Sequence, residues 1–272
     1  MLIAQITDLH IQPEGKRAYG IVDTNQFLAR AVTQLNRLNP QPDLVIATGD
    51  LVDEGSVAEY QALKTLLAPL QAPLYLAMGN HDHRAHFRQI FPELTYVPKD
   101  GPVHYVIESH PLRLIVLDTL VEGKSHGDMD KPRLAWLKAQ LDKAPEQPTM
   151  IFMHHPPFEI GISGMDRLRC QSHEALTALI HRYPAIQRVA CGHVHRSIQV
   201  AWAGTVGSVA PSVAHQVALQ LTTAQRNAFV MEPPAFHLHL WHPNSGLVTH
   251  TQYIGDFDAY SYTTKAPIAL YA

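Results

Sequence analysis

Residues 2–10 read Leu-Ile-Ala-Gln-Ile-Thr-Asp-Leu-His, a short apolar run that ends on an aspartate and a histidine. An apolar, β-branched run of this length, bounded by polar residues, predicts a buried strand. In α/β folds, functional residues tend to lie beyond the carboxyl ends of strands. The two polar side chains that close this run, Asp8 and His10, are therefore the first candidates for a functional site.

Strands and helices alternate through most of the remaining chain. Short apolar runs predict strands over residues 43–48, 74–78, 149–153 and 187–190. Apolar residues at helical spacing predict helices over residues 24–38, 57–67, 134–141 and 172–183. A hairpin is expected from residues 103–107 and 112–117, and short strands follow near residues 198–202, 206–209, 236–241 and 247–254. The pattern predicts an α/β protein whose C-terminal segment is rich in β-structure.

Polar residues of metal-binding type follow five of the predicted strands. Beyond Asp8 and His10, they are Asp50, Asn80 with His81, His154, and His193 with His195. Turn residues normally follow a strand, so one such ending has little meaning. Five strands that all end in residues of metal-binding type predict one shared metal site.

The composition agrees with a folded metal-binding protein. The chain has 272 residues, 46% hydrophobic and 17% charged, which fits one large α/β domain or one domain with a small appendage. The formal charge of −3, without a block of like charge, argues against a nucleic-acid polymer or a membrane surface as partner. Histidine, the commonest metal ligand, is unusually frequent at 18 residues.

The cysteines and the N-terminal residues set an expectation for the compartment. Cys170 and Cys191 cannot form a disulfide framework and match no zinc spacing. The N-terminal stretch reaches a carboxylate too early for a signal peptide, and no apolar run is long enough to span a bilayer. We therefore expect a soluble, cytoplasmic protein.

The residue types favour two transition-metal ions and an anionic substrate. Two divalent cations a few ångströms apart need a bridging anion, and Asp50 is the expected bridge. Oxygen and imidazole donors together suit Mn, Fe, Co or Zn better than Ca or Mg. With Asp8, Asp50 and a bridging hydroxide, the site carries a charge of about +1, which favours a phosphate ester.

The order of these motifs resembles that of a known family. Asp8-x-His10, Gly49-Asp50, Gly79-Asn80-His81-Asp82, His154 and Gly192-His193-x-His195 resemble the signature of the calcineurin-like metallophosphoesterases. Residues 19–23, 116–119 and 154–157 look most like the bacterial class III cyclic-nucleotide phosphodiesterase group, which includes glycerophosphodiesterases of the same type. The resemblance implies a four-layer α/β/β/α sandwich of two mixed sheets. Residues 1–213 would form the catalytic domain, and residues 214–272 a β-rich segment that completes the sandwich and is a candidate oligomer contact.

The resemblance also implies a role for each site residue. One metal would be held by Asp8, His10, Asp50 and His195, and the other by Asp50, Asn80, His154 and His193. A hydroxide between the metals would attack phosphorus in line. His81 would hydrogen-bond the phosphoryl oxygen or protonate the leaving alkoxide. Asp53 stands where phosphoprotein phosphatases keep a carboxylate that orients this histidine, and Asn80, His81 and His215 are candidate substrate contacts.

Several alternatives stay open at this point. The leading function is hydrolysis of small phosphodiesters, either 3′,5′-cyclic nucleotides or glycerophosphodiesters. A phosphomonoesterase on the same centre, such as a nucleotidase or phosphatase, is the alternative enzyme. A non-catalytic scaffold is a third reading, against which the complete ligand set argues. Relatives associate through the segment after the last histidine motif, so we expect a homo-oligomer, a dimer or larger.

The remaining histidines have weaker signals. His155 follows His154 directly, and adjacent side chains on an extended chain point in opposite directions, so a supporting and a purely structural role are equally favoured. A third metal site is conceivable at four histidines that alternate along a predicted hairpin, but an exposed strand face is favoured there; they are His237, His239, His242 and His250.

Overall fold

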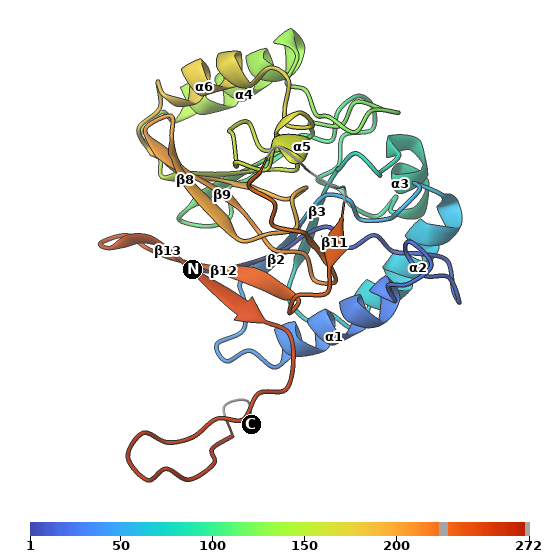
Figure 1. Cartoon of the computed structure of the whole chain (residues 1–272). Helices are drawn as coiled ribbons and strands as arrows, with labels where there is room; N and C mark the ends of the chain where they lie inside the picture. The colour runs from blue at the N-terminus through green and yellow to red at the C-terminus, as the bar shows by residue number, and fades with distance from the viewer. Residues whose placement is uncertain (223–227, 270–272) are drawn as a thin grey trace.

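Two mixed β-sheets face each other at the centre of the structure (Figure 1). This computed structural model describes residues 1–222 and 228–269. The first sheet has the strand order β13-β12-β1-β2-β3. Its parallel strands are β1 (Leu2–Ile6), β2 (Leu44–Thr48) and β3 (Leu74–Ala77), while β12 (Ala235–His242) and β13 (Gly246–Tyr253) run antiparallel to their neighbours.

The second sheet has the order β4-β5-β6-β7-β9-β8. Its four central strands, β5 (Arg113–Leu117), β6 (Thr149–Met153), β7 (Ile186–Cys191) and β9 (Thr205–Val209), are parallel. The edge strands β4 (Tyr105–Ile107) and β8 (Ile198–Trp202) are antiparallel to their neighbours. A separate two-stranded ribbon consists of β10 (Gln216–Val217) and β11 (Phe229–Val230).

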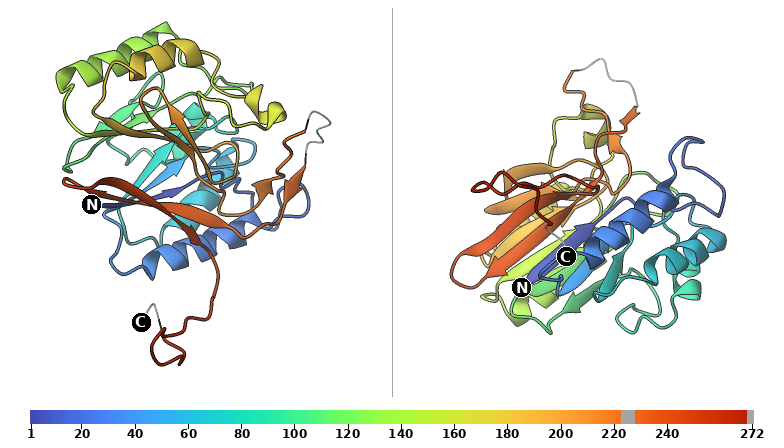
Figure 2. Two further views of the ribbon diagram at one scale, coloured as in Figure 1. Left: turned by 60° about the vertical axis from the view of Figure 1, so that its left-hand side comes forward. Right: turned by 90° about the horizontal axis from the view of Figure 1, so that it is seen from below.

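Helices cover the outer face of each sheet, as the turned views show (Figure 2). The first sheet is covered by α1 (Thr24–Asn36), α2 (Val57–Leu67) and α3 (Arg84–Ile90). The second is covered by α4 (Lys131–Lys143) and α6 (His173–Ile180), while the single turn α5 (Ser163–Asp166) lies apart from them. The expected four-layer α/β/β/α sandwich is confirmed.

Residues on β6 show how the core is divided. Met150 and Phe152 belong to the apolar cluster shared with the first sheet, whereas Ile151 and Met153 belong to the cluster that includes α4 and α6. A strand covered on both faces needs apolar residues at every position, which is why this strand reads as an uninterrupted hydrophobic run.

The C-terminal segment contributes to the first sheet. β12 pairs with β1 in an antiparallel ladder, and β13 pairs with β12 at the sheet edge. Residues 255–269 then run away from the sandwich (Figure 1). Of the segment expected over 214–272, residues 223–227 and 270–272 lie outside the described residues. Among the helices of the described chain, none is long and apolar enough to cross a membrane.

Candidate metal centre

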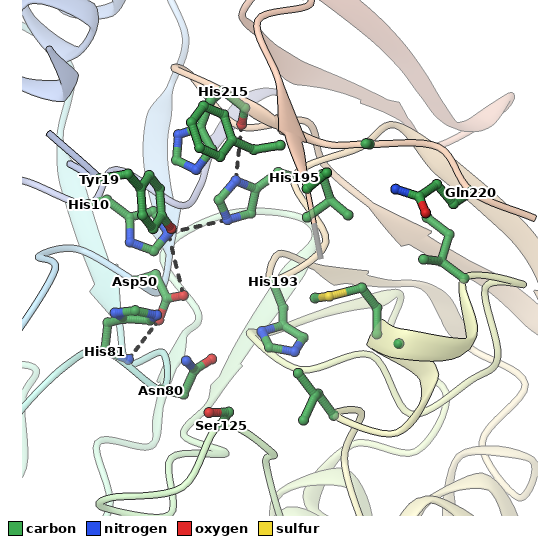
Figure 3. Close-up of a pocket in the computed structure, with 18 residues that line it drawn as sticks. His10, Tyr19, Asp50, Asn80, His81, Ser125, His193, His195, His215 and Gln220 are labelled. Atoms are coloured by element: carbon green, nitrogen blue, oxygen red, sulfur yellow. Dashed lines mark hydrogen bonds and ion pairs between the residues drawn. The ribbon is translucent and has the colours of Figure 1, made fainter. Parts of the chain in front are cut away.

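The loops after β1, β2, β3, β6 and β7 meet at one edge of the sandwich, between the two sheets. They carry Asp8, His10, Asp50, Asn80, His81, His154, His193 and His195. Most of these side chains line a cavity of 480 Å³, and Figure 3 shows them around its open space. Asp8 and His154 lie beneath the cavity and are fully buried. The structure therefore brings together all eight strand-end residues that the sequence pointed to.

The backbone at these residues adopts an uncommon conformation. Five of the seven expected ligands have positive φ angles: Asp8 at 54°, His10 at 45°, Asp50 at 47°, His193 at 71° and His195 at 52°. Residues with a Cβ atom rarely adopt this region, and they do so most often at functional sites. The turns bend the chain sharply so that each side chain points back to the sheet edge.

Glycines before three of these residues permit the close approach of neighbouring turns. A Cβ atom on Gly79 would lie 2.2 Å from the backbone nitrogen of Asp50. On Gly192 it would lie 2.1 Å from Oγ1 of Thr7. The glycines in the Gly-Asn-His-Asp and Gly-His-x-His motifs are thus required because adjacent loops touch there.

One group of candidate ligands consists of Asp8, His10 and His195, whose donor atoms lie within 4.8 Å of one another. Nε2 of His195 lies 3.2 Å from Oδ1 of Asp8 and 3.2 Å from Nε2 of His10. Nδ1 of His195 donates a hydrogen bond to the carbonyl oxygen of His215 at 3.0 Å. The unprotonated Nε2 of His195 therefore points at the other two side chains.

A second group consists of Asp8, Asp50 and His154, also within 4.8 Å. Nδ1 of His154 donates to the carbonyl oxygen of Thr48 at 2.8 Å, which leaves Nε2 facing Oδ2 of Asp50 at 3.3 Å. Oδ2 of Asp50 also lies 3.7 Å from Nε2 of His10. Asp50 thus faces both groups, as expected for a bridging ligand.

These donor atoms fit divalent cations better than they fit one another. Within the described chain, the buried Nε2 atoms of His154 and His193 have no hydrogen-bond partner. A proton or a metal ion must lie between a ring nitrogen and the carboxylate that it faces. Burial lowers the pKa of His193 to about 3, which leaves its Nε2 unprotonated and able to bind a metal ion. The residues of both groups therefore fit two metal ions.

The pKa values of His154 and Asp8 reflect the close approach of carboxylates and imidazole rings at this site. Burial alone would lower the pKa of His154, but Asp50 and Asp8 raise it to about 9. Burial would raise the pKa of Asp8, but His195 and His154 lower it to about 2. Without metal, a proton on His154 partly balances the two carboxylates.

The carboxylate of Asp53 lies near two histidines of the site, His10 and His81. Its Oδ1 accepts a hydrogen bond from Nδ1 of His10 at 3.0 Å and lies 3.9 Å from Nδ1 of His81. The backbone carbonyl of Asp53 accepts from Nδ1 of His81 at 2.6 Å. The main chain of Asp53 thus makes the short contact with His81, while its carboxylate lies within ion-pair distance of His81 and bonds the candidate ligand His10 more closely. That this carboxylate orients His81 stays a prediction.

His155 supports a neighbouring candidate ligand. Its Nδ1 accepts from Oγ1 of Thr119 at 2.7 Å, and its Nε2 donates to Oδ1 of Asn80 at 3.1 Å. Its ring lies 4.8 Å from that of His154, because the strand ends between the two residues and no longer separates their side chains. The sequence left this role open, and no spacing rule would have connected positions 80, 119 and 155.

His215 lines the cavity as expected and lies above two candidate ligands. Its ring centroid is 4.7 Å from that of His195 and 5.6 Å from that of His10. Burial, with smaller effects of His195 and His10, lowers the pKa of His215 to about 2, so the ring is neutral. Tyr19 and Phe229 also contact this ring; they come from a loop and a two-residue strand, where no periodic pattern in the sequence marks a cavity-lining residue.

The histidine-rich hairpin is not an exposed strand face throughout. His242 and His250 are exposed, but His237 and His239 are fully buried between the sheets. Nε2 of His237 lies 3.0 Å from Oγ of Ser197, and Nε2 of His239 lies 3.0 Å from Oε1 of Gln5. None of the four belongs to a metal-ligand cluster within residues 1–222 and 228–269.

A mixed α/β sandwich with aspartate and histidine side chains converging at its sheet edge defines a metal-binding class of α/β proteins. The sequence model described as "Calcineurin-like phosphoesterase" matches residues 1–197. The chain belongs to this family. The two ligand groups agree with the binuclear divalent metal centre that the family uses.

Known proteins support this assignment along most of the chain. A "probable glycerophosphodiester phosphodiesterase" of Arcobacter nitrofigilis is 41% identical over 95% of this chain and 95% of its own length. A "probable cyclic nucleotide phosphodiesterase" of Rhodopseudomonas palustris is 36% identical over 87% of this chain and 86% of its own. The crystal structure of a dimetal phosphatase from Danio rerio has a TM-score of 0.64 at 15% identity, covering 94% of this chain and 99% of that one, which shows a shared fold.

Proposed function

We propose that this protein hydrolyses small phosphodiesters, 3′,5′-cyclic nucleotides or glycerophosphodiesters, at a centre of two divalent metal ions. One metal would be held by Asp8, His10, Asp50 and His195, and the other by Asp50, Asn80, His154 and His193. The observation that carries this proposal is that two groups of candidate ligands meet at the base of an open cavity, where they share Asp8 and where Asp50, a member of the second group, lies near His10 of the first. Relatives named as phosphodiesterases support the same reaction.

The metal ions, when bound, would activate a water molecule and stabilise charge on the phosphoryl oxygens. Water would add to phosphorus while one ester P–O bond breaks, which yields a phosphomonoester and an alcohol. Mn, Fe, Co and Zn all suit the nitrogen and oxygen donors of this site.

His81 is placed to assist the leaving alcohol. The carbonyl of Asp53 fixes its Nδ1, and the ring lines the cavity. Burial opposes protonation, but Asp50 and the Asp53 carbonyl raise the pKa of His81 above its usual value. His81 would therefore donate a hydrogen bond or a proton to a phosphate-ester oxygen.

The charge of the cavity favours diesters over monoesters. Among its described lining residues there is no lysine or arginine to pair with a second phosphate charge. The two arginines that follow the Gly-Asn-His-Asp turn are engaged elsewhere: Nε of Arg84 donates to Oδ2 of Asp118 at 2.6 Å, and Nε of Arg88 donates to the carbonyl of Pro98 at 2.8 Å. Arg196, which follows His195, donates to Oε2 of Glu232 at 2.8 Å. A monoanionic diester balances a centre of about +1, whereas the second charge of a dianionic monoester would have no cationic side chain to pair with.

The test compares kcat/KM for bis-p-nitrophenyl phosphate and p-nitrophenyl phosphate in the presence of Mn²⁺, with chelated enzyme as the blank. We expect the diester to be preferred by more than tenfold. A preference for the monoester would replace the proposed reaction by a phosphomonoesterase on the same centre. The variants Asp50→Ala and Asn80→Ala should lose hydrolysis while remaining folded.

We further propose that the chain is a homo-oligomer, joined through its C-terminal segment. Four large apolar side chains stand exposed there, namely Phe257, Tyr260, Tyr262 and Ile268. Exposed apolar side chains grouped on one segment are typical of a protein contact. Light scattering should give a mass above the 30.3 kDa of one chain, and removal of residues 256–272 should bring it down to a single chain. A monomer at working concentration would refute this.

A cytoplasmic location is the third proposal. The two cysteines, Cys170 and Cys191, are free and buried, which is typical of proteins from a reducing compartment. Cell fractionation with antibody detection tests it, and recovery in an extracytoplasmic fraction would contradict it.

A further inference from the structure

The cavity above the candidate metal centre has two chemically different halves. Its base is polar and holds the candidate ligands. The rest of its lining is largely apolar and comes from the loop that carries Tyr19, from residues on and beside α5, and from residues in and next to β10 and β11, with Ser125 and Gln220 as polar members. Tyr19 and Phe229 form what we call the aromatic wall, and Ile162, Met165 and Leu168 form what we call the aliphatic wall.

The ring of His215 lies between the aromatic wall and the candidate ligand His195. The rings of Tyr19 and Phe229 stack at a centroid distance of 5.1 Å and an angle of 26°. Each lies 5.3 Å from the ring of His215, which in turn lies 4.7 Å from His195. A group attached to a phosphate at the ligands would extend past His215 toward this wall.

A small apolar cluster holds the aromatic wall in place. Ala18, Val22 and Ala214 are buried there, with Phe27 and Phe229 packed against them. Ala18 and Val22 pair through backbone hydrogen bonds, so the loop that carries Tyr19 has its own fixed geometry. The wall is therefore formed in advance of any ligand.

The aliphatic wall lies across the cavity. Met165 is part of α5, and Ile162 and Leu168 flank this turn. Figure 3 shows α5, in yellow, on the far side of the open space from Tyr19 and His215. The two walls leave a slot between them whose base is the candidate metal centre.

Such a slot favours a flat apolar group. A planar ring between the walls would cover apolar surface on both sides and gain ring-to-ring contacts with Tyr19. A glycerol alcohol would gain less apolar contact from the two walls, and its hydroxyl groups would depend on the few polar side chains of the lining, among them Ser125 and Gln220. The charged residue types lysine, arginine and glutamate do not occur among the described residues of the lining.

We propose that the outer half of this cavity is a subsite for a planar ring carried by an alcohol group of the phosphodiester. Phe229 and Met165 determine this specificity, together with Tyr19. The inference rests on the proposed phosphodiester hydrolysis and narrows it. The ring could be a nucleobase or a simple aryl group, because the walls offer apolar surface to both.

The experiment compares three diesters in Mn²⁺-loaded enzyme: 3′,5′-cyclic AMP, methyl phenyl phosphate and glycerophosphoethanolamine. Their phosphomonoester products are quantified by phosphorus NMR, and kcat/KM of each variant is divided by that of the wild type. This ratio removes the different intrinsic reactivity of the three esters. Phe229→Ala and Met165→Ala test the two walls, and Phe229→Tyr keeps a ring in place.

We expect Phe229→Ala and Met165→Ala to lower the ratio at least tenfold for a ring-bearing diester and less than twofold for glycerophosphoethanolamine. Phe229→Tyr should keep the ratio within threefold of 1, and so should Leu240→Ala, which removes an exposed side chain on β12. A fall confined to cyclic AMP assigns the subsite to nucleobases, and a fall for both ring-bearing esters assigns it to aromatic rings in general.

Two outcomes would overturn the inference. Equal losses for all three esters would show a general effect on the site, and unchanged ratios would show that the walls do not contact the alcohol. Thermal unfolding of each variant identifies a folding defect, and Met165→Ala, on a partly exposed turn, keeps the test decisive if Phe229→Ala does not fold. If the wild type cleaves none of the diesters, the proposed function itself is wrong.

Discussion

Nε2 of His10 and Nε2 of His195 face each other at 3.2 Å. Each ring donates a hydrogen bond to another residue through its other nitrogen, Nδ1. Nδ1 of His10 donates to Asp53, and Nδ1 of His195 donates to the carbonyl of His215. With both rings neutral the two lone pairs would repel, so this short contact needs a proton or a cation between the nitrogens. A cation there, shared with Asp8, would be coordinated by both rings.

Metal binding should therefore stabilise the fold. At a free Mn²⁺ concentration 100 times Kd, we expect the free energy of unfolding to rise by about 2.7 kcal/mol. The rise should be much smaller in His195→Ala and unchanged in His242→Ala, which removes an exposed histidine. Thermal unfolding with and without chelator measures it. An equal shift in His195→Ala would contradict the assignment of this ligand.

Metal binding should also release protons. In the metal-free protein the carboxylates raise the pKa of His154 to about 9, so this ring carries a proton at pH 7.5. A metal on Nε2 displaces that proton, and the apparent affinity should therefore fall about tenfold for each pH unit below 9. Calorimetry in buffers with different ionisation enthalpies counts the protons. Binding at pH 7.5 without any release would argue against His154 as a ligand.

Asp53 should affect metal affinity more than the chemical step. Its carboxylate holds His10, so Asp53→Ala should weaken Mn²⁺ binding by about 10–100-fold. Excess Mn²⁺ should then restore kcat. Activity titrated against Mn²⁺ separates the two effects for Asp53→Ala, with Asp53→Asn as the variant that retains a hydrogen-bond acceptor. A kcat that stays low at saturating metal would instead indicate action through His81.

Buried neutral histidines should make the protein sensitive to acid. Burial lowers the pKa of both His104 and His237 to about 4, whereas an unfolded chain takes up these protons near pH 6.5. The unfolded state therefore binds more protons between these values, and stability is lost as pH falls from 6.5 to 4. Each group contributes about 3 kcal/mol to this loss.

Urea unfolding at pH 7 and pH 5 in the presence of chelator tests this acid sensitivity. His237→Phe, which keeps an aromatic ring between the sheets, should reduce the difference between the two pH values. His250→Phe, at an exposed position, should leave the difference unchanged. The same difference in His237→Phe as in the wild type would show that His237 does not titrate in this range.

The main elements of the fold could be predicted because their signals are local. The strand over residues 149–153 is apolar at every position, and the helix over residues 57–67 begins with a capping box between Ser56 and Glu59. The helix α3 was missed because it has only seven residues and is capped by the side chain of His83, which is not a usual capping residue. The turn α5 has no side-chain capping hydrogen bond at its N-terminus.

The site was predictable to the extent that it follows strand ends. Asp8, Asp50 and His154 are each the first or second residue after a strand, so order along the chain was enough to group them. Contacts between distant loops had no such signal. The carboxylate of Asp53 lies closer to His10 than to His81 because of the relative rotation of two turns, which only the three-dimensional structure determines.

The left-handed backbone at five of the candidate ligands bears on how such a protein would evolve. Each such residue costs about 1 kcal/mol relative to glycine, so the sum is about 5 kcal/mol, comparable to the net stability of a modest domain. Glycine at these positions would relax the chain and remove the ligands. In a lineage with no use for the metal site, stability alone would therefore favour glycine at these positions.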